Sequence, residues 1–265
     1  MLDPKDKIET ESVFFLKYLF LFLTTPFRLL MVLFGKRKLK DVFLHTKYFF
    51  SFLMQPKCTF LIVSVLIFSF IVSLFADPFL IEDLANSPSD LLDLRWHTFI
   101  TAGFLHANLY HLLANVFGFL IFGRVVERRL GFSRTLLLFF GSLILSGLFN
   151  SLIHILILES NTATIGASGA LMGFVATAIL LNPFYITFML LIPLPKMVVG
   201  WITLYADFIG ILNPGQDNIA HFAHLGGFFS IAVLMFLLGI DERSKLKRGF
   251  IINIVSFLLA IVLYL

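Results

Sequence analysis

Charged residues and cysteine are both scarce in this sequence. Only 14% of its 265 residues are charged and 59% are hydrophobic, which gives a mean hydropathy of +0.96. A surface that faces water needs more charge than this, so a soluble globular fold is excluded and the solvent is lipid. Cys58 is the only cysteine, which excludes a disulfide framework and a cysteine-based metal cluster. A single cysteine leaves the redox compartment open.

The signatures of several other classes of membrane protein are also missing. The sequence has no His-Glu-x-x-His metal motif and no pair of aspartates within its apolar segments. It has no internal repeat of the kind that many transporters carry, and no low-complexity tract. No small-residue pair follows a short apolar stretch, so no signal-peptide cleavage site is evident.

Long apolar segments are what the sequence does contain. A helix needs about 17 to 25 residues to cross about 30 Å of hydrocarbon. The segments that reach or approach this length are 58–76, 112–126, 135–158, 165–181, 197–212, 219–240 and 250–265. They predict an all-α polytopic membrane protein, with a six-helix core over 58–240 followed by a basic loop and a seventh transmembrane helix in 241–265.

The distribution of basic residues orients these spans. If the chain before residue 58 is cytosolic and the sides alternate, the lysines and arginines fall inside and only Arg95 falls outside. The opposite orientation would invert the positive-inside rule. We therefore predict a cytosolic N-terminus, in a bacterial inner (plasma) membrane. The net charge of +4 is then a topology signal, and no nucleic-acid partner is expected.

Residues 1–57 form a basic, aromatic-rich segment ahead of the core. The stretch 14–34 is apolar but contains Lys17, Pro26 and Arg28, and the basic run GKRKLK follows it. This pattern favours a helix that lies on the cytosolic interface, anchored by its lysines and aromatics. An additional span is the alternative.

Polar side chains gather at the outer ends of three spans that run in the same direction. The second span opens with His106, His111 and Asn115, the fourth with Ser168, and the sixth with His221 and His224. At 1.5 Å per residue, Ser168, His224, His111 and Asn115 lie about 5 to 10 Å below the outer surface. Polar groups are costly inside a bilayer, so a cluster at one depth indicates a functional site.

Glycines flank this cluster. They are Gly166, Gly169 and Gly173 on the fourth span and Gly226 and Gly227 on the sixth. Small faces let two helix backbones approach closely, as a serine–histidine hydrogen bond of about 2.6 to 3.2 Å requires. Gly166 is expected to shape the turn that presents Ser168.

A serine beside a histidine can carry out nucleophilic catalysis. The imidazole takes the proton of the hydroxyl and then protonates the leaving amine. His111, Asn115 and the Ser168 backbone N–H can donate to the oxyanion that forms between these steps. Asp207 is the only acidic residue within a span, and no sequence feature directs it at His224. A Ser168–His224 dyad is therefore favoured over a triad.

Each residue also has a simpler explanation. Ser168 alone is more often a packing residue, and His111 with Asn115 could be an interhelical hydrogen-bond pair. His221 and His224 make an incomplete metal site without a carboxylate or cysteine partner, so no metal and no other cofactor is expected. The conjunction of these residues on three helices favours catalysis.

Three motifs carry a family resemblance. WHTFITAGFLHANLYHLLANVFGFLIFGRVVERRLG, GASGALMG and AHFAHLGG resemble, in order and spacing, the signatures of the rhomboid intramembrane serine proteases over about residues 95–240. The resemblance implies a rhomboid-like six-helix core. It implies that Ser168 is the nucleophile, that His224 is the base and that His111 and Asn115 support the oxyanion.

The resemblance also assigns lesser roles and shows departures. His106 becomes an upstream polar neighbour, His221 a lining residue, and Glu127 a structural acid that pairs with nearby arginines. The sequence departs from the family at His97, which follows Trp96 where an arginine is usual, at Met172 in place of an aromatic residue, and at Ile231 in place of a small residue.

The leading functional hypothesis is an intramembrane serine endopeptidase that cleaves transmembrane segments of membrane proteins near the external face. Its partners would be those substrates and the lipids. The alternative is a catalytically silent rhomboid-like protein that binds membrane clients, whose signature would be loss of Ser168 or His224; both residues are present. A transporter would need several acidic residues near the midplane, where this chain offers only Asp207.

Overall fold

Helices make up most of the chain in the computed structural model, which describes residues 20–189, 192–214 and 219–264. This confirms the predicted all-α polytopic fold. One short antiparallel hairpin accompanies the helices, formed by β1 (Ile186–Met189) and β2 (Ile192–Pro195). Pro193 and Pro195 lie in β2, and proline disfavours a continuous helix over this stretch.

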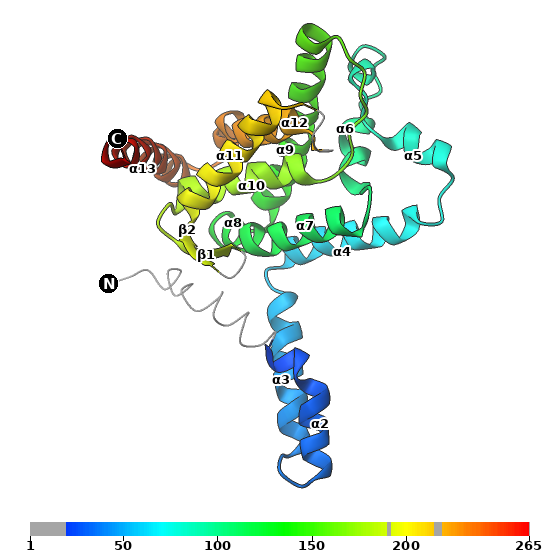
Figure 1. Cartoon of the computed structure of the whole chain (residues 1–265), viewed down its shortest axis with the longest axis vertical. Helices are drawn as coiled ribbons and strands as arrows, with labels where there is room; N and C mark the ends of the chain where they lie inside the picture. The colour runs from blue at the N-terminus through cyan, green and yellow to red at the C-terminus, as the bar shows by residue number, and fades with distance from the viewer. Residues whose placement is uncertain (1–19, 190–191, 215–218, 265) are drawn as a thin grey trace.

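The first described helices form a hairpin of their own. α2 (Thr25–Leu33) packs against α3 (Leu39–Leu53), and the pair projects from the body of the molecule (Figure 1). Pro26 lies in the first turn of α2, where its missing N–H removes no intrahelical bond. α2 and the helical residues just before it cover part of the predicted interfacial stretch 14–34, whose residues before 20 lie outside the described ones. Its position on the membrane stays a prediction.

Helices occupy all seven predicted spans. They are α4 (Lys57–Ser73), α7 (Leu109–Gly118) running through the π-helical turn η4 (Phe119–Gly123) into α8 (Arg124–Leu130), α9 (Phe132–Ile153) with the π-helical turn η5 (His154–Leu158), α10 (Ser168–Leu181), α11 (Lys196–Leu212), α12 (His221–Leu234) with the 3₁₀ turn η6 (Met235–Leu237), and α13 (Ile240–Tyr264). Length and apolar composition suffice for crossing a bilayer in Leu109–Leu130, Phe132–Leu158 and Asp241–Leu263. The apolar helices Lys57–Ser73, Ser168–Leu181 and His221–Leu234 are shorter.

α10 lies at the centre of these helices and packs against α9, α11, α12 and α13. Ten of its fourteen residues are buried, as expected for a helix that is apolar on every side. Small residues bring its neighbours close. A Cβ on Gly169 would overlap Ser146 of α9, and one on Gly227 of α12 would overlap the carbonyl oxygen of Gly169. The predicted glycine faces are therefore real helix contacts.

The C-terminal helix differs from its prediction. Residues 241–249, expected to form a basic loop, are the first turns of a single helix, α13. Asp241 and Glu242 in the first turn favour helix formation there. Gly249 then brings α13 against the backbone of Leu180 in α10, and Asn253 donates to the carbonyl oxygen of Ile179 (3.3 Å).

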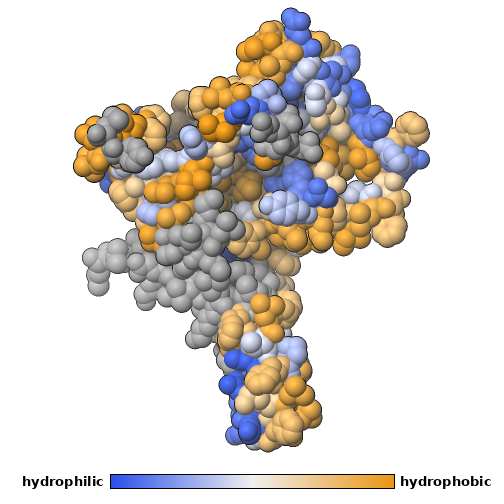
Figure 2. Space-filling view, viewed as in Figure 1, coloured by the Kyte–Doolittle hydropathy of each residue, from blue (hydrophilic) through white to orange (hydrophobic). Residues whose placement is uncertain are grey.

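The long connection between α4 and α7 has its own short helices. They are α5 (Pro78–Leu84), the 3₁₀ turn η2 (Pro88–Leu91), α6 (Thr98–Thr101) and the 3₁₀ turn η3 (Ala102–Phe104). Hydrophilic side chains gather over the side of the molecule that carries α5 and α6, whereas α4 shows mostly hydrophobic ones (Figure 2). Arg95 holds the connection together through Asp83 and Asp90.

This connection also fixes the residues that precede α10. The backbones of Asn86 and Thr164 form a bridge with N···O distances of 3.1 and 2.8 Å. Gly166 N donates to the carbonyl oxygen of Ala102 at 2.9 Å. The start of α10 is therefore held against η3.

Candidate active site

Ser168 is the first residue of α10, which begins later than the predicted span. The first N–H groups of a helix have no partner within the helix, so the Ser168 amide is available as a donor. The turn before it needs glycine, because Gly166 has a φ of +114°. A side chain there would also meet the His111 ring, whose Cε1 lies 2.6 Å from the position of a Cβ. Gly166, two residues before Ser168, therefore lies directly against His111.

His221 and His224 lie one turn apart at the start of α12, which begins at His221 rather than earlier as expected. The contact between Gly227 and the backbone of Gly169 joins this end of α12 to the start of α10. Ser168 and His224 are therefore brought to the same end of the same helix pair. The structure describes both residues and records no hydrogen bond between them, and such bonds are often longer before substrate binds.

Asp207 of α11 contacts both histidines. Its Oδ1 lies 2.8 Å from His224 Nδ1 and 2.9 Å from His221 Nδ1. Because a carboxylate oxygen can only accept, both rings donate from Nδ1. His224 then keeps a lone pair on Nε2, the form that a general base needs.

Sequence reasoning missed this contact, although one signal could have found it. Asp207 lies five residues before the end of the fifth predicted span (197–212), and the next span begins on the same side after a short connection, with His221 and His224 in its first turns. At 1.5 Å per residue, this spacing puts Asp207 at about the depth of the two histidines.

The second predicted span supplies the remaining polar groups from α7. Asn108 caps the helix by accepting from His111 N at 2.9 Å. Asn115, only 2% exposed, donates from Nδ2 to the carbonyl oxygen of His111 (3.1 Å), and its Oδ1 has no partner among the described residues. The His111 ring packs against Gly166, two residues before Ser168.

His106 lies just before α7, with its ring centroid 5.0 Å from that of His111. Burial, assisted by the neighbouring His111, lowers the pKa of His106 to about 4. The ring is therefore neutral at pH 7, as an uncharged neighbour of the site.

Glu127 has a different structural role from the one expected. Its carboxylate accepts from the N–H groups of Cys58 (2.8 Å) and Thr59 (2.7 Å) and from the Thr59 hydroxyl (2.9 Å). These bonds cap the N-terminus of α4, where Pro56 supplies no side-chain cap. Arg124 lies close enough to interact with the charge of Glu127. Glu127 therefore has the expected arginine neighbour, and it caps a helix as well.

Two of the residues that depart from the family pattern are buried in the apolar core, and the third is exposed. Met172 and Ile231 are 3% and 6% exposed and belong to the hydrophobic core. His97 is an exposed residue at the start of α6. None of these departures removes a polar group from the site.

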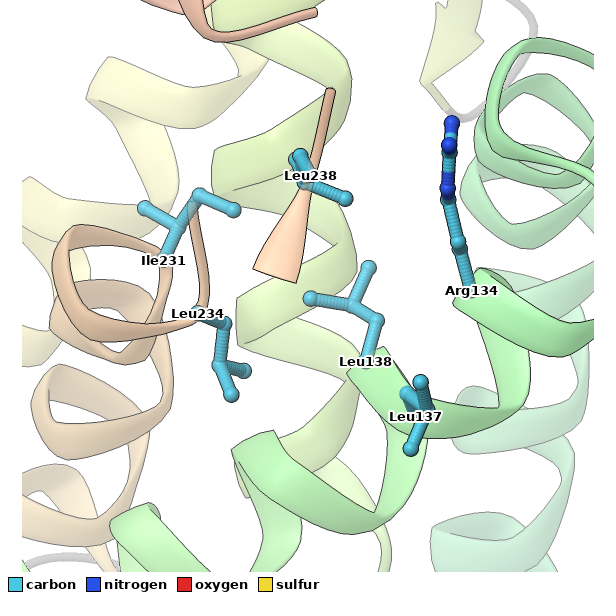
Figure 3. Close-up of a pocket in the computed structure, with 6 residues that line it drawn as sticks. All are labelled: Arg134, Leu137, Leu138, Ile231, Leu234 and Leu238. Carbon is cyan, nitrogen blue, oxygen red and sulfur yellow. The ribbon is translucent and has the colours of Figure 1, made fainter. Parts of the chain in front are cut away.

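One pocket lies elsewhere, between the beginning of α9 and the end of α12. It is lined by Arg134, Leu137, Leu138, Ile231, Leu234 and Leu238 (Figure 3). The lining is apolar apart from Arg134, which bonds to Glu242 of α13 at 3.0 Å. Ser168 and His224 lie at the opposite end of α10 and α12, so this pocket is not part of the polar cluster.

Asp207, His221 and His224 also form the kind of group that can hold a metal ion. One ligand atom from each lies within 4.8 Å of the other two. Asp207 therefore supplies the carboxylate that sequence reasoning found lacking for a metal site.

Comparison with known proteins finds relatives that are named rhomboid-like. RHOMBOID-like protein 12, mitochondrial, of Arabidopsis thaliana is 28% identical over 169 residues, which cover 58% of this chain and 49% of that protein. RHOMBOID-like protein 6, mitochondrial, of the same plant is 34% identical over 165 residues, 57% of this chain and 46% of that protein. Rhomboid-like protein 11, chloroplastic, is 38% identical over 87 residues, 33% of this chain and 30% of that protein.

The chain thus spans half or less of the length of these curated relatives. Their names refer to plant mitochondria and chloroplasts and lend no support to the expected bacterial inner membrane. The profile of the Rhomboid domain family matches residues 93–241, more than half of the chain. Together with the apolar helices, this match identifies an integral membrane protein that belongs to the rhomboid family.

Proposed function

We propose that the protein is an intramembrane serine endopeptidase that cleaves transmembrane segments of other membrane proteins near the external face. Ser168 is the nucleophile and His224 the general base. The observation that best supports the proposal is the 2.8 Å contact between Asp207 Oδ1 and His224 Nδ1. This contact holds the Nδ1 proton and leaves the Nε2 lone pair free to accept a proton, as a general base needs.

The reaction follows from these groups. His224 Nε2 takes the Ser168 proton as Oγ attacks the scissile carbonyl carbon, which forms a tetrahedral intermediate. The imidazolium then protonates the leaving amine, the C–N bond breaks and an acyl-enzyme remains. Water, deprotonated by the same ring, attacks the ester, and the serine regains its proton.

Three donors suit the oxyanion of this intermediate. The Ser168 N–H lies at a helix N-terminus, where the helix dipole favours negative charge, and His111 and Asn115 lie beside it on α7. A substrate helix uses its own amides internally, so it must unwind to present a peptide bond. We therefore expect preference for helix-weakening residues and, by family resemblance, for a small residue before the scissile bond.

The test uses the purified chain in detergent or liposomes with a single-pass model substrate. Cleavage is expected for the wild type and should be lost in Ser168→Ala and in His224→Ala. His221→Ala is the matched control, because it removes a neighbouring histidine that also contacts Asp207, and it should still cleave.

Two results would overturn parts of this proposal. Cleavage by Ser168→Ala would refute the assignment of the nucleophile. A wild type that cuts none of several helix-weakened substrates and does not react with serine-directed phosphonate probes would instead favour a silent protein that binds membrane clients.

A further inference from the structure

The group formed by Asp207, His221 and His224 has an unused ligand atom. Oδ1 of Asp207 accepts both histidine bonds, at 2.8 and 2.9 Å. Oδ2 is buried and has no hydrogen-bond partner among the described residues, and Asp207 as a whole is 4% exposed. A buried carboxylate oxygen without a partner is unusual and needs an explanation.

We propose that these three residues form a binding site for a divalent transition-metal ion of the zinc type. Two imidazole nitrogens and one carboxylate oxygen are the ligand set of many zinc sites with an open fourth position. Magnesium and calcium prefer oxygen ligands throughout, so the two nitrogens disfavour them.

The distances suit such an ion. Zinc bonds of about 2.0 to 2.2 Å in a tetrahedron place neighbouring ligand atoms about 3.3 to 3.6 Å apart. The three ligand atoms lie within 4.8 Å of one another, so a small spreading of the two rings from the carboxylate admits the ion. The side chains of His221 and His224 are 11% and 16% exposed, which gives the ion a path from the surface.

A metal ion here would inhibit the proposed protease. Zinc on Nδ1 of His224 occupies that lone pair, so the neutral ring carries its proton on Nε2 instead. The ring remains neutral, because the proton released from Nδ1 is matched by one that Nε2 takes up from water. It can then no longer accept the Ser168 proton. This inhibition rests on the proposed function, whereas the binding of the ion does not.

The binding test uses full-length Ser168→Ala protein in detergent, stripped of metal and titrated with Zn²⁺ by calorimetry and with Co²⁺ by visible absorption. Adding His221→Ala should weaken the affinity by at least about tenfold, because loss of even an outer-shell partner costs about 10- to 100-fold. Adding His97→Ala, which removes an exposed histidine of the α6 region, should change nothing. Equal affinity with and without His221, or no binding at all, overturns the metal site.

The inhibition test follows the rate at which a fluorophosphonate labels Ser168 in the otherwise unaltered chain. Zn²⁺ should slow labelling, a chelator should restore it, and Mg²⁺ should have no effect. His221→Ala should still be labelled, which also reports correct folding, and its rate of labelling should not change when Zn²⁺ is added. A wild type that binds zinc but is never labelled or active refutes the protease and keeps the metal site. An active enzyme that binds no zinc refutes the metal site and keeps the protease.

Discussion

At the scale of single residues, the proposed reaction depends on the tautomer of His224. The proton on Nδ1 is held by Asp207 Oδ1 at 2.8 Å, and the surroundings of Asp207 are nearly closed to water, since it is 4% exposed. A hydrogen bond to a charged group is stronger where water is excluded. The same carboxylate can stabilise the imidazolium that forms when His224 takes the serine proton.

Asp207→Asn should therefore slow cleavage by about 10²- to 10⁴-fold, the range of general-base contributions. The asparagine has nearly the same size but lacks the charge that stabilises the imidazolium. We expect the loss in kcat with little change in KM, because Asp207 positions the base and does not contact substrate. The control is Asp93→Asn, at an exposed position in the connection between α4 and α7. Activity of Asp207→Asn within about twofold of wild type, or a loss confined to KM, would contradict this role.

Sequence patterns select some of these residues as candidates and miss the contacts of others. Ser168, His224, His111 and Asn115 stand in motifs whose spacing within one helix can be read directly. The contact of Asp207 depends on how α11 approaches α12, which a pattern within either helix does not encode. The helix-capping role of Glu127 was missed for the same reason, because its partners Cys58 and Thr59 are 69 and 68 residues away in the chain.

At the scale of helices, small residues set the distance between α10 and α12. Gly227 lies against the carbonyl oxygen of Gly169, next to Ser168. A Cβ there meets rigid backbone, so the helices must move apart. Overpacking of this kind costs about 1 to 3 kcal/mol, and it also separates the serine from the base.

Gly227→Ala should accordingly lower the thermal unfolding midpoint in detergent and reduce fluorophosphonate labelling of Ser168 even at temperatures where the protein is folded. The matched control is Gly200→Ala in α11, where the new Cβ would meet the Ile179 side chain, with Cδ1 at 2.8 Å and Cγ2 at 3.1 Å, and its nearest neighbours are not backbone atoms. A side chain can shift more easily than a helix backbone, so the control should be milder in both measurements. Equal effects of the two variants would rule out a backbone contact as the cause.

Glu127 caps the N-terminus of α4, whose own N-cap residue, Pro56, makes no side-chain hydrogen bond. Glu127→Ala removes three hydrogen bonds from the start of α4 and leaves buried donors without an acceptor. Bonds to charged groups contribute about 1.5 to 3 kcal/mol each, so the unfolding midpoint should fall by several degrees. Labelling of Ser168 at low temperature should persist, because the cap lies outside the polar cluster. Glu82→Ala, at an exposed position, should leave the midpoint unchanged.

Helix positions followed from apolar length, but several bounds did not. Hydropathy distinguishes segments that lie in lipid from segments that lie in water, but it does not distinguish a polar helix from a polar loop. The basic residues 241–249 form the start of α13 because no proline breaks them and acidic residues occupy the first turn. The β1–β2 hairpin was missed because its residues form a short apolar run without clear alternation, and α3 received no bounds because its residues show no long apolar run.

At the scale of the whole molecule, the surface reflects a lipid solvent. α13 exposes large apolar side chains along its second half, among them Phe250 (58%), Val262 (70%) and Leu263 (79%). Only 17% of the apolar window of this segment is buried inside the molecule. In water such a face would be a site of association with other proteins, whereas in a bilayer it is the surface that contacts lipid.

The predicted topology can be tested by placing single cysteines on the surface, because the chain has only one cysteine of its own. Cys58 is fully buried, and Cys58→Ala removes it. Asp93→Cys and Ser244→Cys then introduce thiols at two exposed positions. The first lies in the connection between α4 and α7, and the second in the basic start of α13. Between them lie the second to sixth predicted spans, an odd number, so the two positions should face opposite sides of the membrane.

The positive-inside rule sets which side each thiol faces. In intact cells or right-side-out vesicles, a membrane-impermeant maleimide should label Asp93→Cys at once and label Ser244→Cys only after permeabilisation. Ser168 would then lie nearer the external face, because α10 begins at the end that is tied to the Asp93 connection through Asn86 and Thr164. Labelling of both thiols in intact cells would mean that an even number of segments crosses. The reverse pattern would place the proposed cleavage site on the cytosolic side.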